Sequence, residues 1–247
     1  MYPELFHIGS FVVTSFGLFV ALGSAIGFWI LSRELQRSGL PPSALDGALT
    51  GLVAGLAGAK LLYVFEHLGQ EPFFDLLLDR GGLSWFGGLF AGVGSALLVF
   101  WILKLPILPI LSAATPALAV GHLFGRIGCF LVGDDYGRPS DLPWAVAFPR
   151  GVPPTTDRVH PTQLYEAIFL AVLAWLLIRW RRNGTPDAIV FGRYLIYAGT
   201  VRFLIEFVRV NPKVALGLTV AQLGTLVLIA GGVFLLTRNR PADPTRK

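Results

Sequence analysis

The sequence predicts an all-α integral membrane protein with about seven transmembrane helices. Of its 247 residues, 54% are hydrophobic and only 14% are charged, whereas roughly 25% of the residues in a typical soluble domain carry charge. The mean hydropathy is +0.65, and a soluble protein of this composition would have too few polar side chains to cover its surface. Seven apolar segments of bilayer length and an uneven distribution of basic residues predict the same class.

Seven segments are long enough to cross a bilayer, whose hydrocarbon core of about 30 Å needs about 20 apolar residues per helix. The first and the last contain no ionisable side chain between Ser10 and Ser32 or between Leu216 and Thr237. The third and fourth are joined by a tight connection at 104–106. The expected spans are about residues 10–32, 45–66, 84–103, 107–131, 161–180, 188–209 and 218–237.

Residues 1–247 are expected to form a single membrane domain. No internal repeat is evident, which argues against an inverted-repeat transporter. The N-terminal segment MYPELFHIGS contains a glutamate and no basic residue. A secretory signal begins with a basic region, so the first apolar segment is expected to remain in the mature protein. Cys129 is the only cysteine, which excludes an intramolecular disulfide.

The basic residues favour one side of the membrane. In a seven-span arrangement one side carries ten of them and the other six, and the positive-inside rule then places the N-terminus outside and the C-terminus in the cytoplasm. The connection 132–160, rich in proline and glycine, falls on the outer side and is expected to form a loop or a lid over a site. The ten are Arg33, Arg37, Lys104, Arg179, Arg181, Arg182, Arg238, Arg240, Arg246 and Lys247, and the six are Arg80, Arg138, Arg150, Arg158, Arg209 and Lys213.

Arg202 and Glu206 lie within the sixth predicted span, where a charged side chain costs roughly 2.5–3.5 kcal/mol on insertion scales. They are four residues apart and share one helix face, together with Arg209. In one interpretation the pair neutralises itself within the helix. In the other, Glu206 orients Arg202 toward an anionic ligand, since the planar fork of arginine binds phosphate oxygens bidentately.

Arg126 lies in the segment GRIGCFLVGDDYGR and has no acidic residue three or four positions away. It therefore needs a partner from another segment or a ligand. The alternative is an arginine that extends toward the membrane surface and pairs with a loop acid. Two arginines from two spans, both near the outer leaflet in the predicted topology, favour a site for a lipid phosphate.

Two aspartates follow Arg126 within the same segment. Asp134 and Asp135 either pair with Arg126 or Arg138, bind the polar head of a substrate, or serve the turn GDDYG, for which aspartate is suited. No third ligand stands at a useful spacing from them, so neither a metal site nor a cofactor is expected.

The candidates for removing a thiol proton are His160, Asp134, Asp135 and His122. A histidine is the natural base among them, because an imidazole titrates near neutral pH. His160 is a candidate base, and its alternative role is that of a helix-entry residue positioned by Pro161. His122, four residues before Arg126, is expected either to hydrogen-bond in the core or to act in catalysis. Cys129 is expected to be a small apolar filler, with a role as an acceptor group as the alternative.

Three blocks stand out at residues 125–138, 160–167 and 202–209, namely GRIGCFLVGDDYGR, HPTQLYEA and RFLIEFVR. They resemble, in order and spacing, the G-R-x-G-N-F-x-N-x-E-x-x-G-R, H-P-S-Q-L-Y-E and R-x-x-x-E-F-x-R patterns of the prolipoprotein diacylglyceryl transferase family. The resemblance covers nearly the whole chain. It implies a seven-span enzyme of the bacterial cytoplasmic (inner) membrane. Such an enzyme transfers the diacylglyceryl group of phosphatidylglycerol to the lipobox cysteine thiol of a prelipoprotein, forming a thioether and releasing glycerol phosphate.

The resemblance also implies which residues form the site. The essential arginines of the family correspond to Arg126 and Arg202, and its glutamates correspond to Asp134 and Glu206. Glu166, in the second block, lies at the start of a predicted helix. Its alternative role there is to interact favourably with the helix dipole. The expected catalytic residues are Arg126, Arg202, Glu206 and His160, and the expected substrate-binding residues are Arg126, Asp134, Gly137, Arg138, Tyr165 and Glu166.

Several positions depart from the family pattern. Phe86 stands where the family has the histidine of an H-G-G block, so a histidine base on the incoming thiol does not carry over. Cys129 and Val132 replace asparagines, Asp134 is one methylene shorter than the family glutamate, and Phe16 replaces a tyrosine. Two alternatives follow, a non-catalytic protein that binds or transports phospholipid and a related transferase with a different acceptor.

Overall fold

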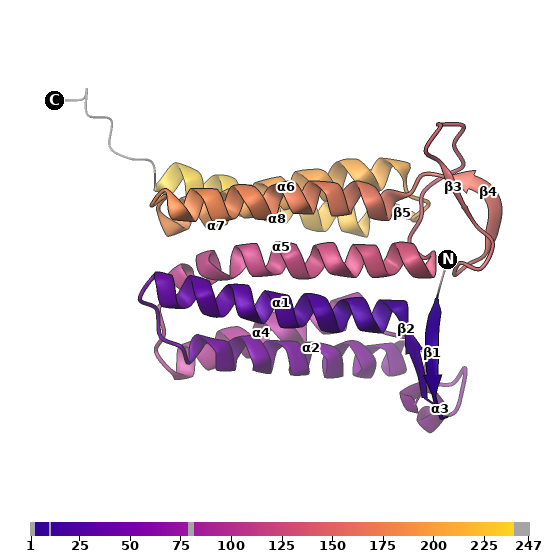
Figure 1. Ribbon diagram of the computed structural model, residues 1–247, viewed down its shortest axis with the longest axis horizontal. Helices are drawn as coiled ribbons and strands as arrows, with labels where there is room; N and C mark the ends of the chain where they lie inside the picture. Colours follow the sequence, from indigo (N-terminus) through magenta and orange to yellow (C-terminus); the bar gives the residue numbers. More distant parts are fainter. Residues whose placement is uncertain (1–2, 10, 79–81, 240–247) are drawn as a thin grey trace. The chain divides into compact units, whose positions relative to one another are not determined.

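The computed structural model describes residues 3–9, 11–78 and 82–239 (Figure 1). Seven helices in this part of the chain are long and apolar enough to cross a membrane, which confirms the predicted fold class. Their bounds lie close to the predicted spans, and the first begins five residues later than predicted. The seven are α1 Ser15–Arg37, α2 Ala44–Glu66, α4 Trp85–Ile102, α5 Ile107–Val132, α6 Thr162–Arg182, α7 Asp187–Ile205 and α8 Val220–Arg238.

Short strands and helices that the sequence did not predict precede α1 or lie between the long helices. The hairpin within the predicted outer loop pairs Val146 with Val159 and Phe148 with Thr155. Such strands are too short to produce a visible alternation of polar and apolar residues. The short elements are the hairpins β1 Glu4–Ile8 with β2 Phe11–Thr14, β3 Val146–Phe148 with β4 Thr155–Val159 and β5 Lys213–Ala215 with β6 Leu218–Thr219, the helix α3 Phe73–Leu78 and the 3-10 helix η1 Glu206–Val208.

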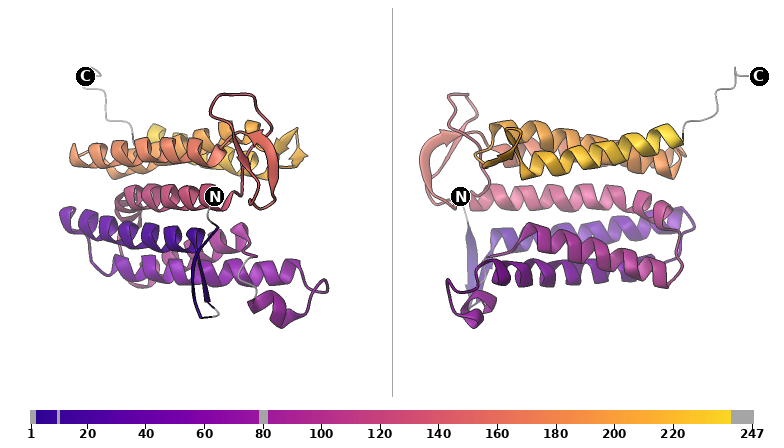
Figure 2. Two further views of the ribbon diagram at one scale, coloured as in Figure 1. Left: turned by 45° about the vertical axis from the view of Figure 1, so that its right-hand side comes forward. Right: turned by 180° about the vertical axis from the view of Figure 1, so that it is seen from behind.

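The chain divides into two compact units, residues 1–31 with 111–247 and residues 32–110, and one membrane domain over 1–247 stays a prediction. In the first unit α5, α6, α7 and α8 alternate in direction (Figures 1 and 2). The C-terminal ends of α5 and α7 therefore lie at the same end as the N-terminal ends of α6 and α8, beside the β3–β4 hairpin. Buried apolar residues join α5, α6 and α7, namely Ala119, Leu173, Ala174, Leu177 and Val190.

Helix α5 contains Pro116 in its interior. A proline has no N–H to donate to the carbonyl four residues earlier, which here belongs to Ser112. The Thr115 hydroxyl donates to that carbonyl instead, at 2.8 Å. The acceptor is thus satisfied within the protein, as the absence of water in a bilayer core requires, and α5 continues to Val132.

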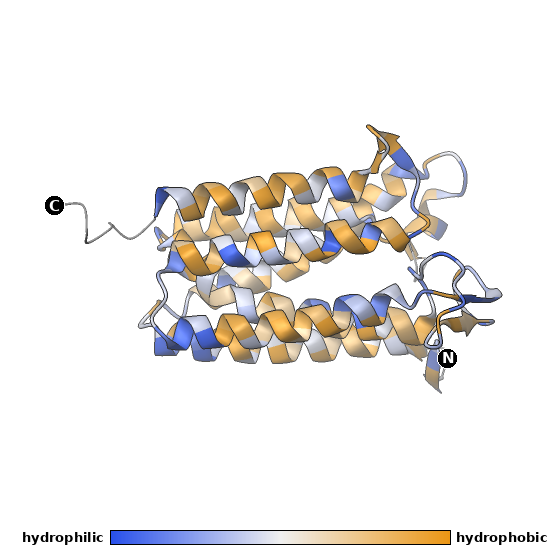
Figure 3. Ribbon diagram, turned by 90° about the horizontal axis from the view of Figure 1, so that it is seen from above, coloured by the Kyte–Doolittle hydropathy of each residue, from blue (hydrophilic) through white to orange (hydrophobic). Residues whose placement is uncertain are grey.

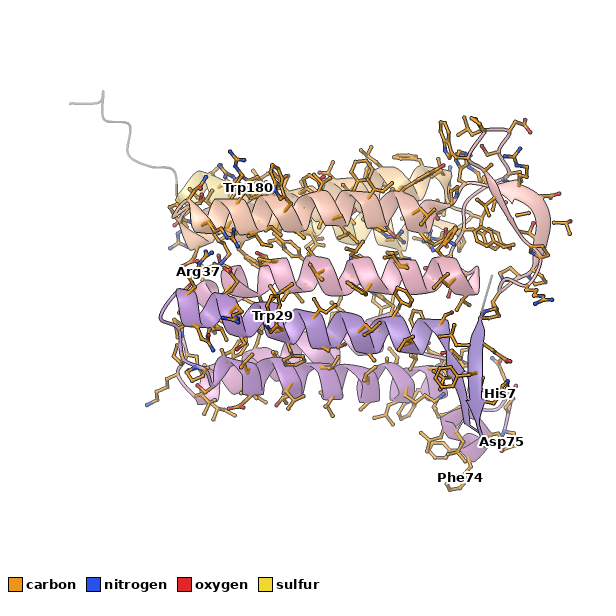
Figure 4. All side chains as sticks on the ribbon, viewed as in Figure 1. His7, Trp29, Arg37, Phe74, Asp75 and Trp180 are labelled. Atoms are coloured by element: carbon orange, nitrogen blue, oxygen red, sulfur yellow. The ribbon has the colours of Figure 1, made fainter. Side chains whose placement is uncertain are left out.

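Hydrophilic residues collect mainly at the ends of the helices, while apolar residues run along them (Figure 3). The last turn of α6 carries Arg179, Arg181 and Arg182 beside Trp180 (Figure 4). The Arg193 guanidinium lies 4.8 Å from the centre of the Trp180 ring, an arrangement typical of anchors at a membrane interface. Four of the basic residues in the charge comparison lie outside the described residues, namely Arg80, Arg240, Arg246 and Lys247.

In the second unit, α2 and α4 pack through glycines. A Cβ atom on Gly58 would lie 2.7 Å from the carbonyl oxygen of Gly87, which is too close for any real contact. The two backbones therefore approach each other directly, as small residues allow in membrane helices. Phe86, next to this contact on α4, is 41% exposed.

Replacing Gly58 by valine should lower the unfolding midpoint, because the added side chain has no space between α2 and α4. The expected cost is about 1–3 kcal/mol, as for other overpacked sites, and thermal unfolding in detergent measures it. Gly94→Ala on α4 is the control, since a Cβ there meets no atom within 4 Å. Equal midpoints for the two variants would contradict the packing argument.

Candidate active site

The GDDYG turn that follows α5 carries two carboxylates of the candidate site, Asp134 and Asp135. Beyond Val132, Gly133 and Asp135 have φ values of 80° and 61°, in the left-handed region that reverses a chain. The backbone N–H groups of Gly133 and Asp134 both donate to the Cys129 carbonyl, at 2.8 and 3.2 Å. The chain thereby turns back, and the two aspartates lie near the last turns of α5.

Three guanidinium and three carboxylate groups alternate around a closed ring in the first unit. They come from α5, the turn after it, α6, α7 and the η1 segment. Each group contacts two groups of opposite charge, so the charges of the fully ionised ring sum to zero. In order, the members of this charge ring are Arg126, Glu166, Arg202, Glu206, Arg209 and Asp135, which contacts Arg126 again.

Glu166 joins the two arginines that the sequence singled out. Arg126 Nε lies 2.7 Å from Glu166 Oε2, and Arg202 Nη1 lies 3.4 Å from Glu166 Oε1. The Glu166 side chain is only 2% exposed. It is therefore a bridge between α5 and α7, and it holds two guanidinium groups beside each other.

Glu206 and Asp135 close the other half of the charge ring. Arg202 Nη2 lies 2.9 Å from Glu206 Oε2, as the four-residue spacing predicts. The same oxygen lies 3.7 Å from Arg209 Nε. Asp135 contacts Arg209 with Oδ1 and Arg126 Nη1 with Oδ2, at 2.8 Å. Arg126, which has no acid on its own helix face, thus has two acidic partners from other segments.

The predicted arginines retain hydrogen-bonding capacity. Their side chains are 15% exposed for Arg126 and 22% exposed for Arg202, whereas Glu166 and Arg209 are almost fully buried. The contacts of the described residues use Nε and Nη1 of Arg126 and the two Nη atoms of Arg202. A guanidinium has five N–H donors. Each arginine therefore has donors left for an anion while the charge ring fixes its orientation.

Backbone hydrogen bonds tie the turn to α6 and η1 at Gly137 and Arg138. Gly137 N–H donates to the His160 carbonyl at 2.9 Å, His160 N–H to the Arg138 carbonyl at 3.0 Å, and Arg138 N–H to the Val208 carbonyl at 2.8 Å. A Cβ on Gly137 would lie 2.5 Å from the Val208 carbonyl oxygen, so the close approach requires glycine. These contacts bring the segments of the charge ring together.

His160 and Tyr165 form a separate polar group next to the β3–β4 segment. His160 Nδ1 lies 3.2 Å from the Tyr165 hydroxyl, which also accepts a hydrogen bond from Trp144 Nε1 at 2.8 Å. Among the described residues, neither His160 nor Tyr165 makes a side-chain hydrogen bond or ion pair with a member of the charge ring. These two predicted site residues therefore lie next to segments of the charge ring without being members of it.

Asp134 lies beside the charge ring but is not part of it. One donor atom each from Cys129, Asp134 and Asp135 lies within 4.8 Å of the others. Both oxygens of Asp135 already contact arginines, so one thiol and one carboxylate remain, fewer ligands than a zinc site needs. The group is therefore better described as the edge of the charge ring than as a metal centre.

The two adjacent aspartates differ in their electrostatic surroundings. Burial raises the pKa of Asp134 and is the largest effect. The Cys129 side chain lowers this pKa, the Asp135 carboxylate raises it, and Arg126 and Arg209 lower it by less than burial raises it. Burial acts in the same direction on Asp135, but Arg209 and Arg126 outweigh it and hold the pKa of Asp135 below its usual range. Asp135 is the permanent anion of the pair, and Asp134 is the more basic carboxylate.

A small cavity of about 20 Å³ adjoins the charge ring at Glu166 and Arg202. Its other walls are mostly apolar and include Phe169 and Val201. His122 also lines it and accepts a hydrogen bond from Arg126 Nε at 3.3 Å, which is the structural role expected as one alternative. The Arg202 guanidinium therefore lies beside an apolar surface at this cavity.

Asp135 and Arg209 belong to the charge ring but not to the predicted site. The spacing of Arg209 from Arg202 and Glu206 places all three on one face of the predicted helix. This spacing was the sequence feature that could have identified Arg209 as a site residue. Asp135 follows Asp134 directly, and the resemblance selected Asp134 alone. Only the turn geometry shows which of the two carboxylates pairs with Arg126.

Comparisons with known proteins identify the sequence family. The family model described as prolipoprotein diacylglyceryl transferase matches residues 3–238. The phosphatidylglycerol–prolipoprotein diacylglyceryl transferase of Pseudoalteromonas translucida is 34% identical, over 95% of this chain and 91% of the relative. The protein of that name from Clostridium tetani is 31% identical, over 97% and 98% of the two chains. The one from Methylobacillus flagellatus is 34% identical, over 95% of each.

Replacing Glu166 by glutamine should destabilise the protein strongly, because Arg126 and Arg202 lose their shared buried anion. Removing one member of a buried ion pair costs about 3–5 kcal/mol, and the shift of the unfolding midpoint in detergent measures it. Asp157→Asn, at an exposed site on β4, is the control and should leave the midpoint unchanged. A Glu166→Gln protein as stable as this control would show that the charge ring does not depend on Glu166.

Proposed function

The chain belongs to the prolipoprotein diacylglyceryl transferase family, and we propose that it transfers the diacylglyceryl group of phosphatidylglycerol to the lipobox cysteine of a prolipoprotein. In this reaction the cysteine sulfur forms a bond to the glycerol carbon, the bond from that carbon to the phosphate oxygen breaks, and glycerol phosphate leaves. The convergence of Arg126 and Arg202 on Glu166 is the observation that carries the proposal. It provides two adjacent guanidinium groups at the end of an apolar helix bundle.

Arg126 and Arg202 bind the phosphate of the lipid through the donors that the charge ring leaves unused. Arginine suits this role because it keeps its charge and binds phosphate oxygens bidentately. Negative charge develops on the phosphate as the ester bond breaks, and preoriented donors stabilise it. Glu166 and Glu206 position the two guanidinium groups, so no reorganisation is needed during the reaction.

The apolar walls of the cavity face the hydrocarbon part of the lipid near its phosphate. Phe169 and Val201 line that cavity together with Arg202. Apolar contacts keep water away from the glycerol carbon, so the thiol rather than water attacks it. This arrangement favours transfer over hydrolysis.

The acceptor peptide contacts the polar group formed by His160 and Tyr165. His160 uses Nδ1 toward the Tyr165 hydroxyl, so Nε2 is left for a hydrogen bond to the peptide. Gly137 and Arg138 hold this segment against the turn that carries Asp134 and Asp135. The lipid phosphate and the acceptor therefore bind on neighbouring parts of the first unit.

The site lies toward the outer face of the bacterial cytoplasmic membrane, with the C-terminus in the cytoplasm. In the first unit the charge ring lies at one end of the helices, and Arg179, Arg181 and Arg182 lie at the other. The positive-inside rule places the arginine-rich end inside. A multi-pass protein of this orientation presents the site where prolipoproteins leave the membrane.

A C-terminal fusion tests this orientation. Green fluorescent protein at the C-terminus should fluoresce, and alkaline phosphatase at the same position should stay inactive, because the first folds in the cytoplasm and the second requires export. An active phosphatase fusion and a dark fluorescent fusion would reverse the topology.

Transfer in vitro tests the activity directly. Purified protein with phosphatidylglycerol and a lipobox peptide should yield a peptide with the mass of one added diacylglyceryl group. Arg126→Lys and Arg202→Lys keep a positive charge beside Glu166 but lose the guanidinium fork, and each should lower the rate at least about 100-fold. The control Arg150→Ala changes an exposed arginine of the outer loop and should keep the wild-type rate.

Two outcomes of this assay would contradict the proposal. Full transfer by both lysine variants would remove the phosphate-binding role of the arginines. Bound phosphatidylglycerol without any adduct in the wild-type protein would indicate a phospholipid-binding protein or another acceptor.

A further inference from the structure

Four carboxylates gather around the charge ring, and one of them has no arginine partner. Glu166, Glu206 and Asp135 each contact two guanidinium groups. Asp134 has no ion pair among the described residues, and its Oδ1 is buried without a hydrogen-bond partner. An arginine-paired carboxylate is a weak base, since the cation stabilises its ionised form, whereas a buried and unpaired carboxylate is a stronger one.

The position of Asp134 places this carboxylate next to the reacting groups. Its donor oxygen lies within 4.8 Å of that of Asp135, which contacts Arg126. The Gln163 side-chain amide, from α6, donates to the Asp134 carbonyl. The backbone at Asp134 is thus tied to α6, and the carboxylate that it carries lies near the Arg126–Asp135 ion pair.

A thiol of the protein itself lies near this carboxylate. Cys129 Sγ, in the last turn of α5, lies within 4.8 Å of a carboxylate oxygen of Asp134. The surroundings of Asp134 therefore accommodate a sulfur atom beside its carboxylate. The charged and titratable groups that face Asp134 are Cys129 and Arg126 from α5, Asp135 from the turn and Arg209 from the segment after η1.

We propose that Asp134 is the catalytic base that takes the proton from the lipobox thiol of the incoming prolipoprotein. This inference rests on the proposed function and assigns the step for which the family histidine, replaced here by Phe86, is lacking. An Asp134 oxygen accepts the thiol proton as the sulfur attacks the glycerol carbon and the carbon–sulfur bond forms. The bond from carbon to the phosphate oxygen breaks, and its electron pair leaves with glycerol phosphate beside Arg126 and Arg202. Asp134 releases the proton to water when the products leave.

The pH dependence of transfer by Asp134→Asn tests the assignment. At pH 7 this variant should lose at least about 100-fold in rate, as for other general bases. A cysteine thiol has an ordinary pKa of about 8.5, so its ionised fraction, and the rate of Asp134→Asn, should rise about 30-fold between pH 7 and pH 9.5. The wild-type rate should rise much less over this range, because its base removes the proton at neutral pH.

Two further measurements separate a base from a structural residue. A lipobox peptide with selenocysteine, whose selenol is ionised at pH 7, should restore the rate of Asp134→Asn at that pH. Asp134→Glu keeps a carboxylate and should keep the wild-type pH profile, even if Asp134→Asn folds poorly. Asp135→Asn is the matched control, and neither alkaline pH nor the selenol should restore its activity, because it breaks the charge ring.

The outcomes distinguish this inference from the proposed function. Full activity of Asp134→Asn at pH 7, or a loss that neither alkaline pH nor the selenol reverses, would overturn the role of Asp134 while the wild-type protein still forms the adduct. A wild-type protein that forms no adduct would overturn both.

Discussion

Charges buried near a membrane persist only when each has partners of opposite sign, and the closed charge ring meets this constraint. Burying a guanidinium or a carboxylate without a partner costs free energy. Removing one member of a buried ion pair is therefore strongly destabilising. Here every member contacts two opposite charges. The members come from five segments, so the ends of α5, α6 and α7 are joined by electrostatics as well as by apolar packing. The same constraint orients the two arginines that we propose as the binding site of the lipid phosphate.

Two backbone features bring the members of the charge ring into contact. Asp135 has a left-handed φ, which directs the turn back toward α5. Gly137 allows the following segment to approach Val208 closely. These features explain why the GDDYG turn is more than a solvated connection. Its conformation selects the carboxylate that joins the charge ring and leaves the neighbouring one outside it.

The site thereby separates two electrostatic tasks between adjacent residues. Asp135 is paired with Arg126 and Arg209, and these contacts favour its ionised form. Asp134 is half-buried beside them, and its Oδ1 is buried without a partner among the described residues; a carboxylate of this kind is suited to proton transfer. Phe86, which stands where the family has a histidine, lies in the second unit of the chain. The proton-transfer group that we infer, Asp134, belongs to the first unit, as the arginines do.

The sequence alone determined the seven helices and the pairing of Arg202 with Glu206, because both depend on local properties. Bilayer thickness sets the length of an apolar helix, and a four-residue spacing places two side chains on one face. The partners of Arg126 were decided by the tertiary structure. Glu166 lies 40 residues away in the chain, and the choice of Asp135 over Asp134 depends on a turn conformation. No periodicity in the sequence encodes which helix ends meet, since that follows from packing and from charge balance across several segments.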